Sequence, residues 1–366
     1  MKSLKWVFSG YLLLQLSLLI GFSYKLNKNL LETLVNWDAT HYLHIALHSY
    51  TRESLYAFFP LWPMLLHTYA ATGLPETYLP LYSTVVSTLL YFAVLWILGT
   101  KDWTQAWTRP SIFTMLFFTF CPGSWVFFTP HTESLFLFLS FFSFYYASKN
   151  KIKHASLLAG LASLSRNQGV FVILSISFFA FMNENSGRFK ARCFSFLKSI
   201  SLSGFIYAGW LLYLYLKTGN PLTSVHAQEF WARDLPTRAV SLATYFRNAL
   251  WLSYNNMYGA LLFWMGLGIG TRLLFKKSSL EKSFGLYLIL SFLIWPVQGN
   301  NFPNAYRFSA VLFPFWIIIG NFIHRFIKTK FHRKSTRVIL KSLILTIWIL
   351  ISLAKGANYY QGLWCY

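Results

Sequence analysis

The residue types best suited to chemistry in this chain stand in one short polar segment, Asn36-Trp37-Asp38-Ala39-Thr40-His41-Tyr42, which lies between apolar stretches. Ionisable side chains beside a bilayer are costly and commonly functional. An ionised carboxylate such as that of Asp38 can act as a general base that takes a proton from a hydroxyl group. Two alternatives stay open, namely that Asp38 caps a helix beginning near Ala39 and that the segment is an aromatic interfacial loop.

Composition indicates the environment of this segment. Of the 366 residues, 55% are hydrophobic and only 11% are charged, whereas a soluble domain has roughly 25% charged residues. The sequence therefore predicts an all-α, polytopic, integral membrane protein in which residues 1–366 form a single domain.

Apolar runs separated by polar breaks predict about 9–11 transmembrane helices, given that a span needs about 20 residues. Residues 6–22 are expected to be a retained first span, because no small-x-small cleavage site follows them. Residues 55–72 contain Pro60 and Pro63, which favours an interfacial or re-entrant helix. The remaining runs are 78–99, 110–123, 132–148, 154–165, 170–183, 196–216, 250–273, 284–298, 306–324 and 337–355, of which 154–165 and 170–183 are expected to be half-helices meeting at a polar tip.

The distribution of the formal net charge of +22 is explained by membrane topology. With the N-terminus inside, most of the 32 Lys and Arg residues fall in cytoplasmic segments, as the positive-inside rule requires. We therefore expect contacts with membrane lipids and no nucleic-acid partner.

The polar groups that are not topology signals gather on the opposite face. They stand in a first extracytoplasmic loop with interfacial helices (24–77), in a second large loop (217–249) and at three shorter turns that contain Glu133, Arg166-Asn167-Gln168-Gly169 and Arg307. Arg166 and Arg307 are candidates for binding a phosphate, because guanidinium groups bind such anions in a bidentate manner. The alternative is that either arginine reaches for lipid headgroups.

Metal and cofactor sites are not indicated. Cys121, Cys193 and Cys365 lack metal-binding spacing. His41, His44 and His48 share one helical face, where a metal site is possible, but interfacial or substrate-binding imidazoles are favoured. We expect no cofactor and assign no residue to a metal site, and metal dependence stays open.

A set of motifs resembles the PIG-V family of membrane mannosyltransferases and its prokaryotic relatives. These motifs are Trp37-Asp38-Ala39-x-His41-Tyr42, Ile45-Ala46 with Tyr50, Ala57-Phe58-Phe59-Pro60, Cys121-Pro122, Thr132-Glu133-Ser134-Leu135-Phe136, and Arg166 with Gly169. Two positions depart from the family pattern: Thr40 stands where an acidic residue is frequent, and Asn167-Gln168 stands where the family more often has Ser-Asn.

The resemblance implies a glycosyltransferase fold of the GT-C type with a catalytic first extracytoplasmic loop. It also implies a polyprenyl-phosphate-mannose donor and a glycolipid or glycan acceptor. Asp38 would then be the base of an inverting transfer, and Arg166 and Arg307 would hold the donor phosphate. Substrate contacts are expected from Trp37, His41, Tyr42, Glu133, Asn167 and Gln168. The absence of glycosylation acceptor sequons favours a prokaryotic cytoplasmic membrane, with the endoplasmic reticulum membrane as the eukaryotic equivalent.

Two further functions remain open. A flippase or carrier for a lipid-linked sugar would share the basic loops and aromatic spans, but it should have ionisable residues near the middle of the bilayer and paired inverted halves. A non-catalytic component of a glycan-assembly complex is the third possibility.

Overall fold

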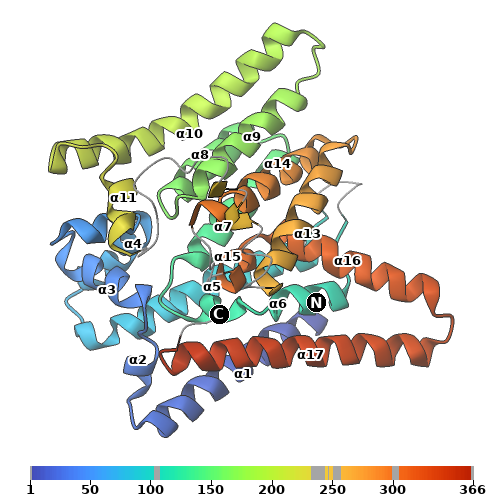
Figure 1. Cartoon of the computed structure of the whole chain (residues 1–366), viewed down its shortest axis with the longest axis horizontal. Helices are drawn as coiled ribbons and strands as arrows, with labels where there is room; N and C mark the ends of the chain where they lie inside the picture. Colours follow the sequence, from blue (N-terminus) through green and yellow to red (C-terminus); the bar gives the residue numbers. More distant parts are fainter. Residues whose placement is uncertain are drawn as a thin grey trace. The chain divides into compact units, whose positions relative to one another are not determined.

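The computed structural model describes residues 2–102, 108–231, 244–245, 247–249, 257–298 and 305–363, and within these ranges it contains helices and no β-strand (Figure 1). The longer helices are α1 (Lys2–Leu26), α3 (Asp38–His48), α4 (Leu61–Ala70), α5 (Leu79–Thr100), α6 (Ile112–Thr119), α7 (Glu133–Ser148), α8 (Ile152–Ser163), α9 (Gly169–Met182), α10 (Phe189–Thr218), α13 (Met257–Leu274), α14 (Ser279–Leu293), α16 (Phe313–Lys330) and α17 (Lys334–Tyr360). The short ones are α2 (Leu30–Thr33), η1 (Glu53–Ala57), η2 (Glu76–Tyr78), η3 (Ser124–Phe128), α11 (Thr223–His226), η4 (Ala227–Phe230), η5 (Trp295–Gln298) and α15 (Ala305–Ala310).

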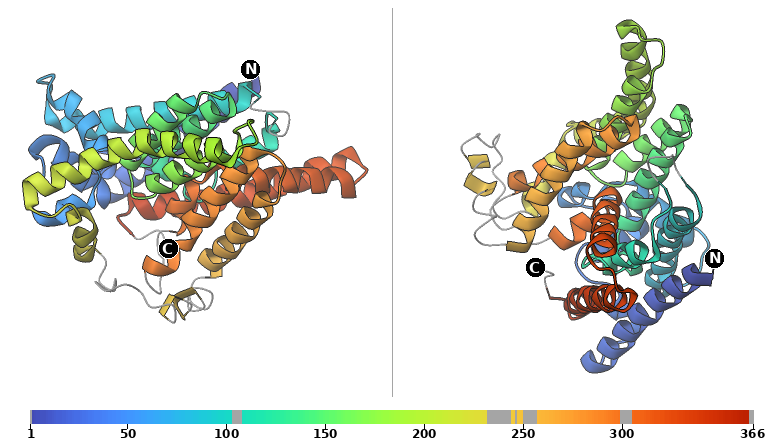
Figure 2. Two further views of the ribbon diagram at one scale, coloured as in Figure 1. Left: turned by 90° about the horizontal axis from the view of Figure 1, so that it is seen from above. Right: turned by 90° about the vertical axis from the view of Figure 1, so that its right-hand side faces the viewer.

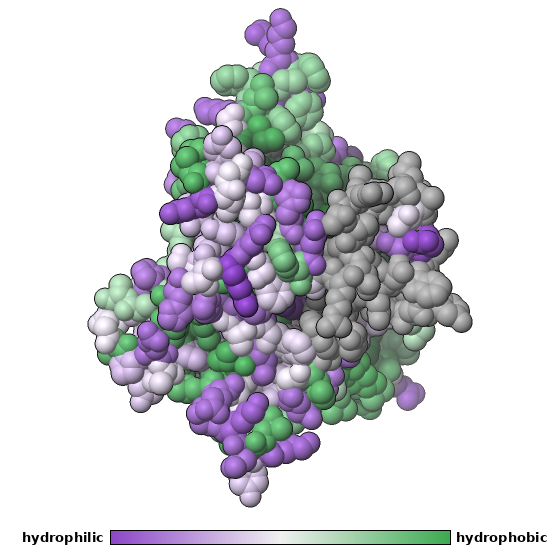
Figure 3. All heavy atoms as spheres, turned by 60° about the vertical axis from the view of Figure 1, so that its left-hand side comes forward, coloured by the Kyte–Doolittle hydropathy of each residue, from purple (hydrophilic) through white to green (hydrophobic). Residues whose placement is uncertain are grey.

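Five helices of the described chain are long and apolar enough to cross a membrane: Leu4–Leu26, Glu76–Thr100, Phe189–Thr218, Met257–Leu274 and Lys334–Tyr360. Large hydrophobic side chains are exposed at the surface (Figure 3), among them Phe205 and Leu216 of α10. Lipid contact accounts for such exposure, because apolar side chains need no cover from hydrocarbon. The protein is therefore an integral membrane protein, as predicted.

Most predicted apolar runs contain one helix each, and four runs differ, among them 284–298, which holds the end of α14 and η5. The run 306–324 holds two helices, α15 and α16, because Pro314 stands in the first turn of α16 and favours the start of a new helix. The run 110–123 is helical only over Ile112–Thr119. Within 55–72 the chain forms η1 and α4 rather than one span, and residues 250–256 of the run 250–273 lie outside the described residues.

The chain divides into two compact units, and the division falls inside α3 and inside α7. Unit 1 comprises Met1–Thr40, Gly73–Leu137 and Pro303–Tyr366, and unit 2 comprises His41–Thr72 and Phe138–Phe302. The expectation that residues 1–366 form one glycosyltransferase domain stays a prediction, as does the extracytoplasmic placement of 24–77 and 217–249.

In unit 1, α17 packs along α1, and α6 packs against α16 (Figure 2). Trp348 of α17 stacks on Phe117 of α6 with ring centroids 4.5 Å apart, and its indole NH donates to the Phe117 carbonyl at 2.8 Å. Trp348 thus anchors the middle of α17 on α6, while the C-terminal end of α17 contacts η3 and contributes to the candidate site.

In unit 2, α8, α9 and α10 pack against one another, and α14 packs against both α9 and α13 (Figure 1). Small residues allow α13 and α14 to approach closely: a Cβ on Gly285 would lie 2.6 Å from the carbonyl oxygen of Gly270. Close backbone packing of this kind is common between helices in membranes. The turn between α8 and α9 carries the Arg166 tip predicted from the sequence.

Candidate active site

Asp38 is the first residue of α3 and follows a backbone turn at Trp37. Trp37 has a φ of +57°, in the left-handed region that bulky residues rarely adopt. Its carbonyl accepts hydrogen bonds from the Thr40 amide at 3.1 Å and the Thr40 hydroxyl at 2.7 Å. A backbone conformation of this kind costs about 1–3 kcal/mol and is concentrated at functional sites.

A buried arginine joins two carboxylates beside this turn, all within unit 1. Arg307 of α15 donates from Nη1 to Oδ2 of Asp38 at 2.5 Å and from Nε to Oε1 of Glu133. The Glu133 side chain is fully buried and that of Arg307 is 9% exposed, whereas that of Asp38 is 36% exposed. The three charges sum to −1, and Asp38 is the member that a substrate can reach.

The electrostatics of the site keep Asp38 ionised. Burial raises the pKa of Asp38, but the positive charge of Arg307, the nearby His131 and the hydrogen bond from Arg307 together outweigh burial and the repulsion from Glu133. The pKa of Asp38 is therefore held below its usual range, so this carboxylate is present as a base at neutral pH.

An aromatic cluster around Tyr359 supports the segment that precedes Asp38. Tyr359 of α17 donates its hydroxyl to the Leu34 carbonyl at 2.8 Å and accepts the Asn36 amide at 3.3 Å. Its ring stacks on Trp125 at 4.4 Å, and His131 packs edge-on against it at 5.4 Å. Sequence reasoning missed Tyr359, because nothing in the local sequence of α17 distinguishes it from other interfacial tyrosines.

The Arg166 tip lies in unit 2. Arg166 is 7% exposed and Gln168 is 3% exposed, whereas Asn167 is exposed. The buried guanidinium of Arg166 acts electrostatically on Tyr287 of α14, which also interacts with Ser140 of α7. Because Arg166 is buried, it is not an arginine that reaches outward to lipid headgroups.

His41 and Tyr42 also belong to unit 2 and pack into an aromatic group. The His41 ring lies 4.4 Å from Trp231 and 5.0 Å from Phe58, and Tyr42 meets Phe58 edge-on at 5.2 Å. The Trp231 indole donates to the Ser54 carbonyl at 2.7 Å, which links η4 to the start of η1. These rings lie tilted or edge-on to one another, and the exposed Trp231 offers a face on which a sugar can lie.

The other predicted histidines make ordinary polar contacts. His44 Nε2 lies 2.9 Å from the Thr51 hydroxyl, and its ring packs against His48 at 5.0 Å. Over the part of the chain that the structure describes, no three His, Cys, Asp or Glu side chains converge to hold a metal ion.

Comparison with known families decides what kind of protein carries this arrangement. The profile of the mannosyltransferase (PIG-V) family matches residues 12–258, more than half of the chain. The chain belongs to the PIG-V mannosyltransferase family. The matched range contains Asp38, Glu133 and Arg166, and it ends before Arg307.

Two relatives within this family are GPI mannosyltransferases 2. The protein from Schizosaccharomyces pombe is 26% identical over 141 residues, which are 37% of this chain and 30% of the relative. The protein from Drosophila pseudoobscura pseudoobscura is 30% identical over 124 residues, which are 30% of this chain and 26% of the relative. The matches span less than a third of the length of either relative.

Among solved structures, the chain is similar to the oligosaccharyltransferase of Archaeoglobus fulgidus. The apo crystal structure matches with a TM-score of 0.48 and 14% identity, over 95% of this chain and 56% of that one. The complex with an inhibitory peptide and a dolichol-phosphate matches with a TM-score of 0.47, 14% identity and the same coverage.

Proposed function

We propose that this protein transfers mannose from a polyprenyl-phosphate-mannose donor to a lipid-linked glycan acceptor at the extracytoplasmic surface of its membrane. Family membership supports mannosyl transfer. The observation that carries the proposal is the partly exposed Asp38, which the buried Arg307 holds in its ionised form. A substrate-accessible carboxylate at the edge of a membrane-embedded helical unit is what deprotonation of a sugar hydroxyl requires.

In this mechanism Asp38 removes the proton from the acceptor hydroxyl as its oxygen attacks C1 of mannose. The new bond forms between that oxygen and C1 while the bond from C1 to the phosphate oxygen breaks. Phosphate leaves with the bonding electrons and needs no proton, so one base is sufficient and the configuration at C1 inverts. Because Arg307 engages Oδ2 of Asp38, we assign the proton-accepting role to Oδ1.

The departing phosphate needs positive charge nearby, and stabilisation of developing charge is usually the largest catalytic contribution. We assign this role first to Arg166, which is buried beside Tyr287. Arg307 positions Asp38 and is the second candidate for the phosphate. Trp37, His41 and Tyr42 supply ring faces for sugars, while Asn167 and Gln168 offer amide groups beside Arg166. Glu133 orients Arg307.

The proposal places the protein in a prokaryotic cytoplasmic membrane, because the sequence has no glycosylation acceptor sequon. In a eukaryote the equivalent location would be the endoplasmic reticulum membrane, with the site facing the lumen.

The direct test is a transfer assay on the purified full-length protein with Asp38→Asn. We expect the wild type to transfer mannose from polyprenyl-phosphate-mannose to a component of a membrane glycolipid extract, identified by product mass. The variant should lose at least about 100-fold in kcat, which is the lower range for removal of a general base. Glu32→Gln is the control, since Glu32 is exposed and bonded to Asn29, and it should retain activity.

Transfer at the wild-type rate by Asp38→Asn would remove Asp38 from the mechanism. Movement of a lipid-linked sugar across vesicles without mannosylated product would instead favour a carrier. No transfer and no translocation by the wild type would favour a non-catalytic component of an assembly complex.

A further inference from the structure

Unit 2 contains a polar cavity that the mechanism above does not use. Its volume is about 520 Å³, within the range of about 300–1,000 Å³ that holds small ligands. Two cations, Arg52 and Lys217, line it together with Glu53, Thr218 and Asn220. Asn220 accepts the Leu222 amide through Oδ1 at 2.9 Å, so its NH₂ group serves as a donor.

A second cavity of about 830 Å³ lies in the same unit and has a mainly apolar lining. Ile45, Pro63, Met64, Leu164, Ile206 and Trp210 are among the residues that form it. They come from α3, α4, the end of α8 and α10, so one wall of the cavity belongs to a candidate membrane span.

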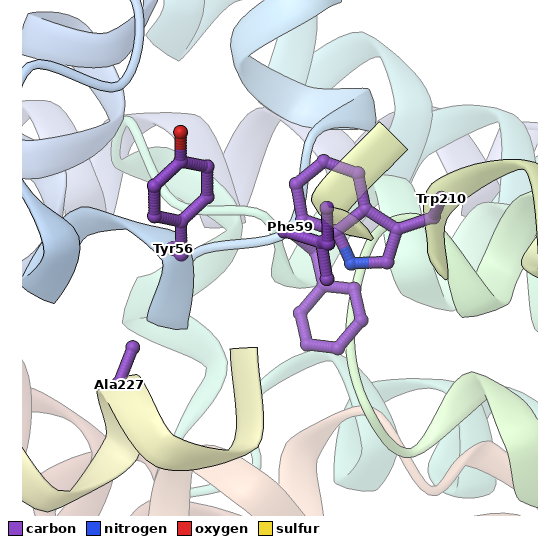
Figure 4. Packing of buried hydrophobic residues seen from close by; sticks show 5 residues of the cluster. Tyr56, Phe59, Trp210 and Ala227 are labelled. Carbon is purple, nitrogen blue, oxygen red and sulfur yellow. The ribbon is translucent and has the colours of Figure 1, made fainter. Parts of the chain in front are cut away.

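Tyr50 lines both cavities, which makes them neighbours. Its ring stacks on Tyr56 at 4.7 Å with an interplanar angle of 3°, and its hydroxyl donates to the Phe58 carbonyl at 2.8 Å. Tyr50 packs against a buried cluster that contains Tyr56, Phe59, Trp210 and Ala227 (Figure 4). Tyr50 is therefore held by aromatic packing at the place where the two cavities adjoin.

Hydrogen bonds join the elements that surround the polar cavity. Gln228 of η4 donates to the Ala57 carbonyl of η1 at 3.0 Å, and Thr218 and Thr223 share a hydrogen bond of 2.6 Å. The first bond joins η4 to η1 and the second joins the end of α10 to α11, which also contacts η1. Arg52 and Lys217 therefore line one cavity from different elements.

The chemistry of the two cavities defines their occupant. The two cations of the polar cavity suit a phosphate, while its carboxylate, amide and hydroxyl groups suit sugar hydroxyls. The adjoining apolar space suits hydrocarbon chains. The carboxylate of Glu53 accepts hydrogen bonds from hydroxyl groups, which a sugar-bearing headgroup supplies.

We propose that the paired cavities around Tyr50 bind the lipid-linked acceptor, an amphiphile whose anionic headgroup carries a sugar. The identification of the bound lipid as the acceptor rests on the proposed function. The two cavities and the residues that line them do not depend on it. The proposal assigns the acceptor to residues other than Arg166 and Arg307, to which we assign the donor phosphate.

The kinetic test uses Arg52→Gln, Lys217→Gln and the double variant of the full-length protein, with the acceptor identified in the transfer assay. We expect the KM for the acceptor to rise about tenfold in each single variant, the order expected for loss of one charged hydrogen bond. The kcat and the donor KM should stay within about twofold. Lys190→Gln is the matched control, because Lys190 is exposed at the opposite end of α10. A rise in the donor KM, or an unchanged acceptor KM in the double variant, would overturn the proposal.

A binding test separates this site from catalysis. The inactive Asp38→Asn protein is purified with phosphatidylglycerol, whose headgroup is anionic and carries hydroxyls, or with zwitterionic phosphatidylcholine, and retained lipid is measured by native mass spectrometry. We expect the Asp38→Asn protein to retain phosphatidylglycerol and the acceptor to displace it. The triple variant Asp38→Asn, Arg52→Gln, Lys217→Gln should bind neither phosphatidylglycerol nor the acceptor. Retention unaffected by these substitutions, or lipid that the acceptor does not displace, would contradict an acceptor site. If Asp38→Asn is fully active while the Arg52 and Lys217 effects persist, the base assignment fails and this site stands.

Discussion

At the scale of single residues, the arrangement of three charges explains why the site can be held in place. An unpaired charge in a membrane protein interior is costly, and breaking a buried pair costs about 3–5 kcal/mol because the remaining charge has no partner. Arg307 serves two carboxylates at once, which suits a guanidinium with several donors and not a single ammonium. The buried Glu133 fixes one end of Arg307, and Asp38 is held at the exposed end.

The pH dependence of transfer follows from this pairing. In the wild type the lowered pKa of Asp38 keeps the base ionised in mild acid, and the base is lost only as the pH falls through that low pKa. Removal of the positive charge in Arg307→Gln leaves only His131 to oppose the effects of burial and Glu133, so the pKa of Asp38 should rise. We expect the acidic limb of kcat/KM against pH to move up by about 1–3 units, the usual effect of an adjacent opposite charge.

Arg307→Lys is the control for this experiment. Its ammonium keeps the charge but cannot reach both carboxylates with the same geometry, so the acidic limb should return toward the wild-type position while kcat stays reduced. An acidic limb identical in the wild type and Arg307→Gln would show that Asp38 is not the group that titrates.

At the scale of elements, α15 is a six-residue helix that brings Arg307 to the site, and η3 determines where it lies. Gly123, which precedes η3, allows the backbone of α15 to come very close: a Cβ at this position would lie 2.0 Å from the Tyr306 carbonyl oxygen. The residue adjacent to that carbonyl is Arg307. Any added side chain must therefore displace the element that carries the guanidinium.

We predict that Gly123→Ala lowers kcat by about tenfold or more, because a displacement of about 1 Å in an active site can cost 100-fold. The thermal midpoint of unfolding should also fall. Gly10→Ala in α1 is the control, since a Cβ at Gly10 meets nothing within 4 Å, and both its activity and its midpoint should match or exceed those of the wild type. Wild-type kcat in a folded Gly123→Ala protein would mean that the position of α15 does not govern the reaction.

At the scale of the whole molecule, the proposed reaction requires the segment around Asp38 to face away from the cytoplasm. The excess of basic residues in the opposite loops supports this orientation through the positive-inside rule. It is a statement about topology and can be tested without an activity assay.

We expect Glu32→Cys, in a background with Cys193 and Cys365 replaced by Ser, to react with a membrane-impermeant maleimide in intact cells. Cys121 is fully buried and should remain silent. Lys330→Cys, at the exposed end of α16, should react only after permeabilisation. The reverse pattern would place Asp38 on the cytoplasmic side and end the proposed use of a donor at the outer surface.

The class of the protein, most of its helices and its family could all be predicted from the amino-acid order. Hydrophobic length predicts helices directly, because in lipid a helix satisfies its own backbone hydrogen bonds. The Asp38 motif is contiguous in the chain and therefore readable. The half-helices around Arg166 were also predictable, since a polar tip between two short apolar runs leaves few other arrangements.

Only the tertiary structure shows which charged residues contact one another. Glu133 and Arg307 are 174 positions apart and Asp38 and Arg307 are 269 apart, and Tyr359 reaches Leu34 across 325 positions. No local pattern encodes such pairs, because each is set by how whole helices pack. For the same reason the close approach of α15 to Gly123 could not be predicted from the sequence, whereas Pro314 is a local signal for the start of α16.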